Sequence, residues 1–216
     1  MPIPAESTNV RRAQESELPE LAEGLARAFQ NDPVSEWLLP DPQRRELVQT
    51  DVYYEYLWWA MTDGSVYTTD EREGAAIWLP SNAPLPEGLE ERIRETYGPD
   101  ARQLTIGTQT MAQYRPHEPH QKLTAIGAFA RGRGIGTALL QRHMAELEQN
   151  GEVGYLNASS EGSKRLYIRL GWSSLHLGVV NGIRVDANDE TSPTMYPMTF
   201  NRQPSLGIRG RRAYHG

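Results

Sequence analysis

The chain has 216 residues, enough for one globular domain with a sizeable core, and 38% of them are apolar and 23% charged. Its net charge of −6 argues against binding to a nucleic-acid backbone, and no apolar run is long enough to span a membrane. The absence of cysteine excludes disulfides, thiolate nucleophiles and cysteine-ligated metals, and without a secretory signal we expect a cytoplasmic protein.

The first part of the chain predicts mostly helices, with one strand hairpin among them. In chain order we expect a strand at 9–14, helices at 16–30, 34–39 and 44–61, strands at 65–69 and 74–80, and helices at 87–97 and 101–114. The second half of the 44–61 helix is apolar on nearly every side, so its faces must be covered either by core or by a ligand.

The later part of the chain alternates strands and helices. We expect strands at 120–128, 154–160, 172–180 and 194–201, with helices at 135–150 and 163–170. This succession predicts an α/β fold, with helices packed on a central sheet. A single domain over residues 1–201 is then followed by a basic tail, 202–216, which is either a solvated extension or a docking segment.

A glycine-rich segment lies between the strand at 120–128 and the helix that follows it. It reads R-x-x-G-x-G at Arg131, Gly134 and Gly136, which fits neither a P-loop nor a dinucleotide-binding fingerprint. Glycines let the backbone approach an anion closely, and the free N–H groups and the dipole of the helix attract it. The segment suits a pyrophosphate, although a tight turn without a ligand could use the same residues.

This segment resembles the coenzyme-A-binding core of the GCN5-related N-acetyltransferases, whose signature is Q/R-x-x-G-x-G/A. "YLNASSEGSKRLYIRLGW" is similar to a later strand and helix of that family, and "AFQNDPVSEWLLPDP", "AIWLP" and "RPHEPHQKL" are similar to its puromycin N-acetyltransferase-like bacterial branch. The resemblance covers roughly residues 10–201. It implies a mixed sheet of about seven strands flanked by helices, in which two parallel strands splay apart and hold the pantetheine of acetyl-CoA.

The same resemblance implies the cofactor site, with no metal ion. The residues expected to bind acetyl-CoA are Ile126, Gly127, Ala128, Arg131, Gly132, Arg133, Gly134, Ile135, Gly136, Thr137, Asn157 and Ser163. The chain departs from the family because the loop before Arg131 is shorter and lacks a proline, and Asn157 stands where an acid is usual. The first departure could move the oxyanion donor by a residue, and the second could change the acceptor or abolish turnover.

Acetyl transfer to an amine needs a neutral amine, a stabilised oxyanion and a proton for the leaving thiolate. Tyr167 matches the general acid of the family, and the backbone N–H of Ala128 is the expected oxyanion donor. On the 163–170 helix we expect Leu166 and Leu170 to face the core, with Tyr167 turned away from them. Candidates for the general base are His117, Glu118, His120, Asp32 and Glu36, with a water relay as the alternative, and none is assigned.

Aromatic residues favour a bulky acceptor with flat or apolar parts. The residues expected to line its site are Asp32, Trp37, Tyr54, Trp58 and Trp78. We therefore expect acetyl transfer from acetyl-CoA to a small-molecule amine, such as an antibiotic, an aminonucleoside or a natural-product intermediate, by a monomer or homodimer that binds neither nucleic acid nor membrane. Acetylation of protein lysines or N-termini, and a non-catalytic acyl-CoA-binding regulatory module, remain open.

Overall fold

A mixed sheet of eight strands lies at the centre of the structure. The computed structural model describes residues 9–130 and 132–201. The strands are β1 (Val10–Arg12), β2 (Ser65–Thr69), β3 (Gly74–Pro80), β4 (His120–Ala128), β5 (Val153–Ala158), β6 (Ser173–Ser174), β7 (Ile183–Arg184) and β8 (Thr194–Phe200). Their order is β1-β2-β3-β4-β5-β8-β6, and β7 pairs with β8. Within the described ranges β4 and β5 are parallel and the other pairs antiparallel, which confirms the predicted mixed α/β sheet.

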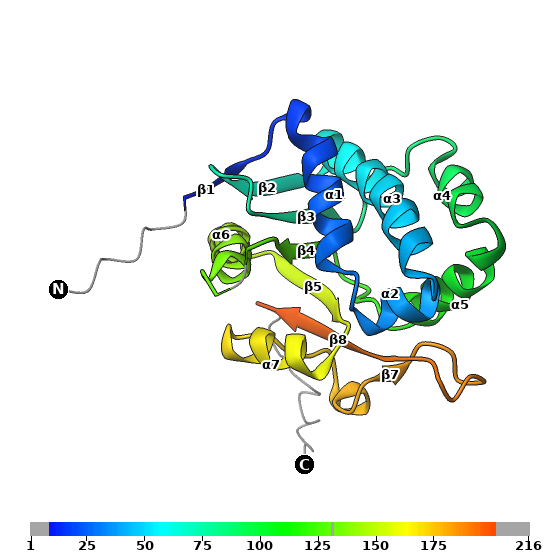
Figure 1. Cartoon of the computed structure of the whole chain (residues 1–216). Coiled ribbons are helices and arrows are strands. Elements are labelled where there is room, and N and C mark those ends of the chain that lie inside the picture. Colours follow the sequence, from blue (N-terminus) through cyan, green and yellow to red (C-terminus); the bar gives the residue numbers. More distant parts are fainter. Residues whose placement is uncertain (1–8, 131, 202–216) are drawn as a thin grey trace, which may run out of the picture.

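Helices cover both faces of this sheet. They are α1 (Leu18–Ala28), α2 (Pro33–Leu38), α3 (Pro42–Asp63), α4 (Leu89–Tyr97), α5 (Ala101–Ala112), α6 (Ile135–Asn150) and α7 (Glu161–Arg169), with short 3-10 turns at Glu15–Glu17, Gly98–Asp100 and Leu177–Val179. Helices α1 and α3 lie side by side over one face, and α6 packs on the other (Figure 1). None of the helices in the described part of the chain has the length and apolar character needed to cross a membrane.

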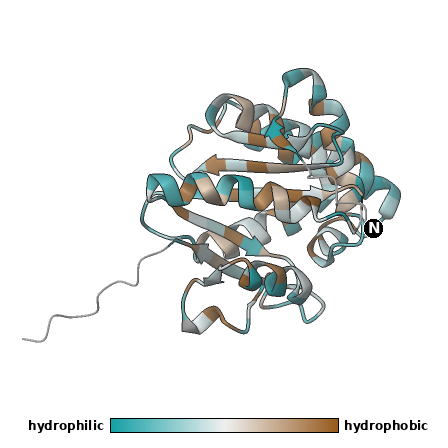
Figure 2. Ribbon diagram, turned by 90° about the vertical axis from the view of Figure 1, so that its left-hand side faces the viewer, coloured by the Kyte–Doolittle hydropathy of each residue, from teal (hydrophilic) through white to brown (hydrophobic). Residues whose placement is uncertain are grey.

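Each face of the sheet has its own apolar core, and in Figure 2 the strands carry much of the hydrophobic colour. The core under α6 includes Trp78, Leu139, Leu140, Leu147 and Trp172. The core under α1 and α3 includes Leu18, Leu21, Leu25, Leu57 and Ile77. All three leucines of α1 belong to this core and are fully buried.

The predicted strand at 172–180 is wrong. Only Ser173 and Ser174 pair with β8, and a 3-10 turn follows them. Pro197 of β8 accepts a hydrogen bond from Leu175 N–H (3.0 Å) but has no N–H to return, so the ladder stops there. Further along the edge of β8, the short strand β7 takes the remaining positions.

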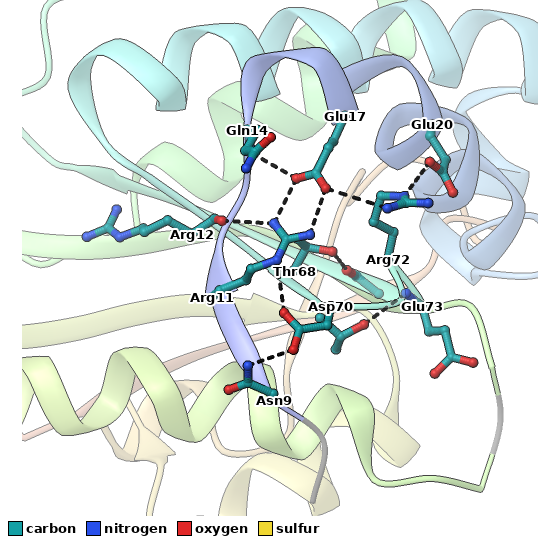
Figure 3. Close-up of polar contacts among 12 residues, drawn as sticks. Asn9, Arg11, Arg12, Gln14, Glu17, Glu20, Thr68, Asp70, Arg72 and Glu73 are labelled. Atoms are coloured by element: carbon teal, nitrogen blue, oxygen red, sulfur yellow. Dashed lines mark hydrogen bonds and ion pairs between the residues drawn. The ribbon is translucent and has the colours of Figure 1, made fainter.

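Ion pairs attach β1 to the 3-10 turn at Glu15–Glu17 and the β2–β3 hairpin to α1 (Figure 3). Arg11 of β1 donates to Glu17 (2.7 Å) and to Asp70 (3.1 Å), which lies after β2. Arg72, in the turn between β2 and β3, donates to Glu20 of α1 (2.6 Å). These contacts position the hairpin whose second strand, β3, borders β4.

Candidate active site

The parallel strands β4 and β5 separate after three residue pairs. The last of these pairs joins Lys122 to Tyr155, yet β4 continues to Ala128 and β5 to Ala158. Beyond the separation β4 stays paired with β3, and β5 stays paired with β8. A gap therefore opens between two strands that remain neighbours in the sheet.

A β-bulge marks the point of separation. Ile77 of β3 pairs with Ala125 and Trp78 pairs with Leu123, so Thr124 is an extra residue on β4. A bulge bends its strand and increases the local twist, which accounts for β4 turning away from β5 here. The hydroxyl of Thr124 is buried without a hydrogen-bond partner among the described residues.

The register of β4 on β3 decides which backbone groups face the gap. The N–H of Phe129 donates to the carbonyl of Glu73 (2.7 Å), so the antiparallel alternation directs the N–H and C=O groups of Ala128 and Ile126 away from β3. The N–H and C=O groups of Gly127 point toward β3 instead. A Cβ at Gly127 would lie 3.0 Å from Leu25, so this glycine lets α1 pack closely on the strand.

The gap opens into a cleft of about 1040 Å³ on the side of the sheet covered by α1, α2, α3 and α5. Seven of the residues proposed from the sequence line it: Asp32, Ile126, Gly127, Ala128, Asn157, Ser163 and Tyr167. Its apolar wall includes Phe29, Tyr53, Tyr56, Tyr97, Leu104 and Met111. The long segment between β3 and β4, which contains α4 and α5, thus supplies part of the cover over the cleft.

Tyr167 is the buried residue of α7, with 8% of its surface exposed, and it packs against Trp172 at 6.1 Å between ring centroids. We expected Leu166 and Leu170 to face the core in its place. Leu170 does pack there, but Leu166 is half-buried, because the helix turns its tyrosine inward. Burial, with the charge of Asp32, raises the pKa of Tyr167 well above its usual range, so the phenol keeps its proton at neutral pH.

Asp32 caps α2 at the edge of the cleft. Its Oδ1 accepts hydrogen bonds from the backbone N–H groups of Val34 (3.0 Å) and Ser35 (3.2 Å), and Ser159 donates its hydroxyl to Oδ2. Burial nevertheless raises the pKa of Asp32, because it disfavours the charged form more than these bonds favour it.

The other candidate bases do not line the cleft. His120 is buried, its ring edge lies against Tyr155, and its Nδ1 is 2.8 Å from the carbonyl oxygen of Glu118. His117 and Glu36 are exposed. Of the five candidates, Asp32 is the one that lines the cleft.

Asn157 and Ser163 line the cleft but already have partners. The Oδ1 of Asn157 accepts a hydrogen bond from the hydroxyl of Tyr155 (2.9 Å). Ser163 and Ser160 form a capping box, in which each side-chain oxygen accepts the backbone N–H of the other residue (3.1 and 3.2 Å). Both side chains are therefore oriented before any ligand binds.

The glycine segment leads into α6 through a left-handed turn. Gly132 and Gly134 have positive φ angles, of 79° and 72°, and the first helical bond runs from Ala138 N–H to Gly134 (2.9 Å). The amides of the first turn therefore lack intrahelical partners. A Cβ at Gly132, Gly134 or Gly136 would meet nothing within 4 Å, so the segment faces open space. Arg133 forms an ion pair with Glu73, and Arg131 lies outside the described residues, as does the tail at 202–216.

No family model matches the chain, and no curated protein matches it. Several solved structures, however, are similar to it. A Corynebacterium glutamicum protein described as "histone acetyltransferase HPA2 and related acetyltransferase" is 23% identical, with a TM-score of 0.62, over 93% of this chain and 99% of that one. The Drosophila melanogaster polyamine N-acetyltransferase is 19% identical (TM-score 0.58, 90% and 98% covered), and arylalkylamine N-acetyltransferase 2 of Aedes aegypti is 13% identical (TM-score 0.54, 90% and 98% covered).

The chain has the fold of the GCN5-related N-acetyltransferases. The separated strands β4 and β5 are the splayed pair that the resemblance implied, and they lie at the positions where the sequence predicted them.

Four of the aromatic residues proposed for the acceptor site lie away from the cleft of this fold. Tyr54 and Trp58 are 42% and 44% exposed on the outer side of α3, while Tyr53 and Tyr56 of the same helix line the cleft. Trp78 is fully buried beneath α6. Trp37 donates its Nε1–H to Asp189 (2.8 Å) and so holds the 186–192 loop against α2.

Several residues of the cleft were not singled out from the sequence. Arg115, Lys122, Thr124 and Ser159 all line it. Lys122 could have been recognised from the sequence, since it is a charged residue inside a strand that is otherwise mostly apolar. The bulge at Thr124 could not, because an extra residue in a strand has no fixed residue type.

Proposed function

We propose that this protein transfers the acetyl group of acetyl-CoA to the amine of a small molecule. The observation that carries the proposal is the separation of β4 from β5, which opens into a cleft with Tyr167 in its wall. The acceptor classes that we favour are amine-bearing antibiotics, aminonucleosides and natural-product intermediates. We further expect a cytoplasmic monomer or homodimer.

The residues on both sides of the gap fit acetyl-CoA. Ile126 and Ala128 present to the gap backbone groups that pair with no strand of the described chain, which suit the amides of pantetheine in the manner of an added strand. Open space faces the three glycines between Gly132 and Thr137, where backbone amides would hold the pyrophosphate. Arg131 would add charge to that site, and Arg133 would do so once it leaves Glu73.

Acetyl-CoA supplies the thioester, and the chain supplies the proton transfers and the oxyanion site. As the amine nitrogen bonds to the carbonyl carbon, the N–H of Ala128 stabilises the negative charge that develops on oxygen. The carbon–sulfur bond then breaks, and Tyr167 donates its phenolic proton to the leaving sulfur. Asp32 accepts the proton that the amine gives up, since it is the candidate base that borders the cleft.

Two observations favour a small acceptor over a peptide. The α4–α5 segment lines the cleft with Tyr97, Leu104 and Met111, which narrows it where a peptide acceptor needs an open groove. Two of the similar structures are described as N-acetyltransferases of polyamines and of arylalkylamines, which are small amines.

The test is release of free thiol from acetyl-CoA with panels of amine antibiotics, aminonucleosides, simple amines and peptides. Tyr167→Phe is compared with wild type and with Tyr54→Phe, which removes an exposed phenol outside the cleft. We expect turnover with one small-molecule class, a loss of about tenfold or more in Tyr167→Phe, and no loss in Tyr54→Phe. Turnover with peptides alone would support a protein acetyltransferase, and acetyl-CoA binding without thiol release from any acceptor would support a non-catalytic module.

A further inference from the structure

Two cations line the end of the cleft where β4 and β5 are still paired. Lys122 is the last residue of β4 that pairs with β5, and it is half-buried. Arg115, in the segment between α5 and β4, lies exposed at the rim. The two are close enough for the charge of Arg115 to act on Lys122.

Neither cation has an ion-pair partner among the described residues. Asp32 is the one acidic residue in the described lining of the cleft, and its oxygens already accept three hydrogen bonds. Glu90 and Glu118 act on the neighbouring groups Tyr56 and His120, but neither lines the cleft. This end of the cleft therefore holds positive charge that the described residues leave uncompensated.

Uncompensated charge next to a partly desolvated wall is costly, and a bound anion would remove that cost. The cost is visible at Lys122, since burial and the nearby guanidinium lower its pKa to about 8. An anion bound between the two cations would be held by charge-assisted hydrogen bonds, with the guanidinium able to bind it in a bidentate manner.

The phosphates of acetyl-CoA are a poor match for this anion. Lys122 and Ala128 lie six residues apart on one strand, a span of about 20 Å at the usual rise of a strand. The glycine segment follows Ala128, so the pyrophosphate site and the two cations lie at opposite ends of β4. An anion bound at Lys122 would therefore belong to the other substrate.

The aromatic wall connects the cations to Asp32. Tyr53 and Tyr56 are three residues apart on α3 and therefore share a face. The charge of Asp32 acts on Tyr53, and that of Arg115 acts on Tyr56. An acceptor lying along these rings would have its amine near Asp32 and its other end near the cations.

Building on the proposed function, we propose that the acceptor is an amine that also carries an anionic group, a carboxylate or a phosphate, bound by Arg115 and Lys122. An apolar or aromatic body joins the two ends of this acceptor. Purely cationic acceptors such as polyamines are disfavoured, because their far end would meet two positive charges.

Matched acceptors test this directly. One pair is para-(aminomethyl)benzoate and para-methylbenzylamine, and a second is para-(aminomethyl)phenyl phosphate and para-methylbenzylamine, so that the two pairs separate carboxylate from phosphate on the same aromatic body. For at least one pair we expect kcat/KM to be about tenfold higher for the anionic member than for the neutral one. This preference should fall about fivefold or more in Lys122→Met and in Arg115→Gln, because KM for the anionic member rises. The control is Arg27→Gln, which removes a cation of the same cleft that is paired with Glu23 (3.4 Å) and should keep the ratio.

Calorimetric binding of the anionic amines to protein loaded with coenzyme A separates this inference from the function on which it rests. If no acceptor releases thiol but an anionic amine binds and loses affinity in Lys122→Met, the proposed activity fails and the anion site stands. A preference for the neutral members, an equal loss for both members of a pair, or no binding of either anionic amine would overturn the inference. Thermal unfolding of each variant checks that it is folded.

Discussion

Ser159 donates a hydrogen bond to the carboxylate of Asp32 across 127 positions of the sequence, and so connects the start of α2 to the loop between β5 and α7. The same carboxylate caps α2 through two backbone amides. One partly buried acid thus joins two walls of the cleft, and its charge also acts on Tyr167. A phenol that keeps its proton and a carboxylate of raised pKa in one cleft suit the proposed roles of general acid and general base in an acyl transfer.

Asp32→Asn should lower kcat/KM by about tenfold or more and remove the acid limb of its pH profile. The carboxylate can accept a proton only above its pKa, and burial raises that pKa, so the wild-type limb should lie above the range of an ordinary aspartate. Ser159→Ala removes a hydrogen bond that favours the charged form, and should shift the limb to still higher pH. If Ser159→Ala does not move the acid limb, the limb reports the titration of another group.

The glycine segment allows a test that separates folding from cofactor binding. A side chain at Gly136 meets no protein atom within 4 Å, so Gly136→Leu should fold with an unchanged or higher Tm, because leucine favours the helix. The added bulk should nevertheless weaken acetyl-CoA binding about tenfold or more, measured by calorimetry, by filling the space that we propose for the pyrophosphate. Gly136→Ala is the control, since alanine satisfies the signature and should bind nearly as wild type. Equal binding by both variants would place the phosphates elsewhere.

His143 of α6 should make the protein acid-sensitive. It is buried against Trp78 at 4.1 Å between ring centroids, and burial lowers its pKa despite the nearby charge of Glu146. Below the ordinary imidazole pKa of about 6.5, the unfolded chain takes up a proton that the folded chain refuses, so the free energy of unfolding falls as pH falls. The charge of Arg12 also acts against protonation of His143, while that of Glu152 favours it.

Urea unfolding at pH 7.5 and pH 5 measures this effect. From pH 7.5 to pH 5 the free energy of unfolding of His143→Phe should fall by about 1 kcal/mol less than that of the wild type. His117→Gln, at an exposed histidine, should follow wild type. If both variants keep the wild-type dependence on pH, the acid sensitivity comes from carboxylates instead.

The sequence located the elements of this fold better than it located the lining of its cleft. Strands β3 and β4 begin and end where predicted, because their apolar runs are bounded by polar and proline-containing segments. The direction of the α3 side chains was not readable. In "VYYEYLWWAM" almost every position is apolar, so no stripe distinguishes the cleft-facing Tyr53 and Tyr56 from the exposed Tyr54 and Trp58.

The separation of β4 and β5 was reached only through resemblance to a family. Register shifts are set by how a strand fits its neighbours, and the extra residue at Thr124 carries no mark in composition or periodicity. That Lys122 and Arg115 have no ion-pair partner in the described part of the chain is likewise a property of distances between elements. A sequence shows which charges are present, but not which of them lack a partner.

Gly64 is where the fold should be least tolerant of an added methyl group. It ends α3 immediately before β2, and a Cβ there would lie 2.1 Å from the carbonyl oxygen of Trp78 in β3. Because the obstacle is backbone in the middle of the sheet, neither a rotamer change nor a small shift relieves it. Gly64→Ala should therefore lower the free energy of unfolding by about 3 kcal/mol.

Gly151→Ala is the matched control for this effect. That glycine ends α6 at a φ of 68° but faces open space, so the substitution should cost only about 1 kcal/mol of backbone strain. Urea titrations of both variants beside wild type give the comparison. If both variants lose the same free energy of unfolding, α3 and β3 can move apart at no greater cost than that of a strained φ in a turn. The close packing of α3 on the sheet would then not be a source of stability.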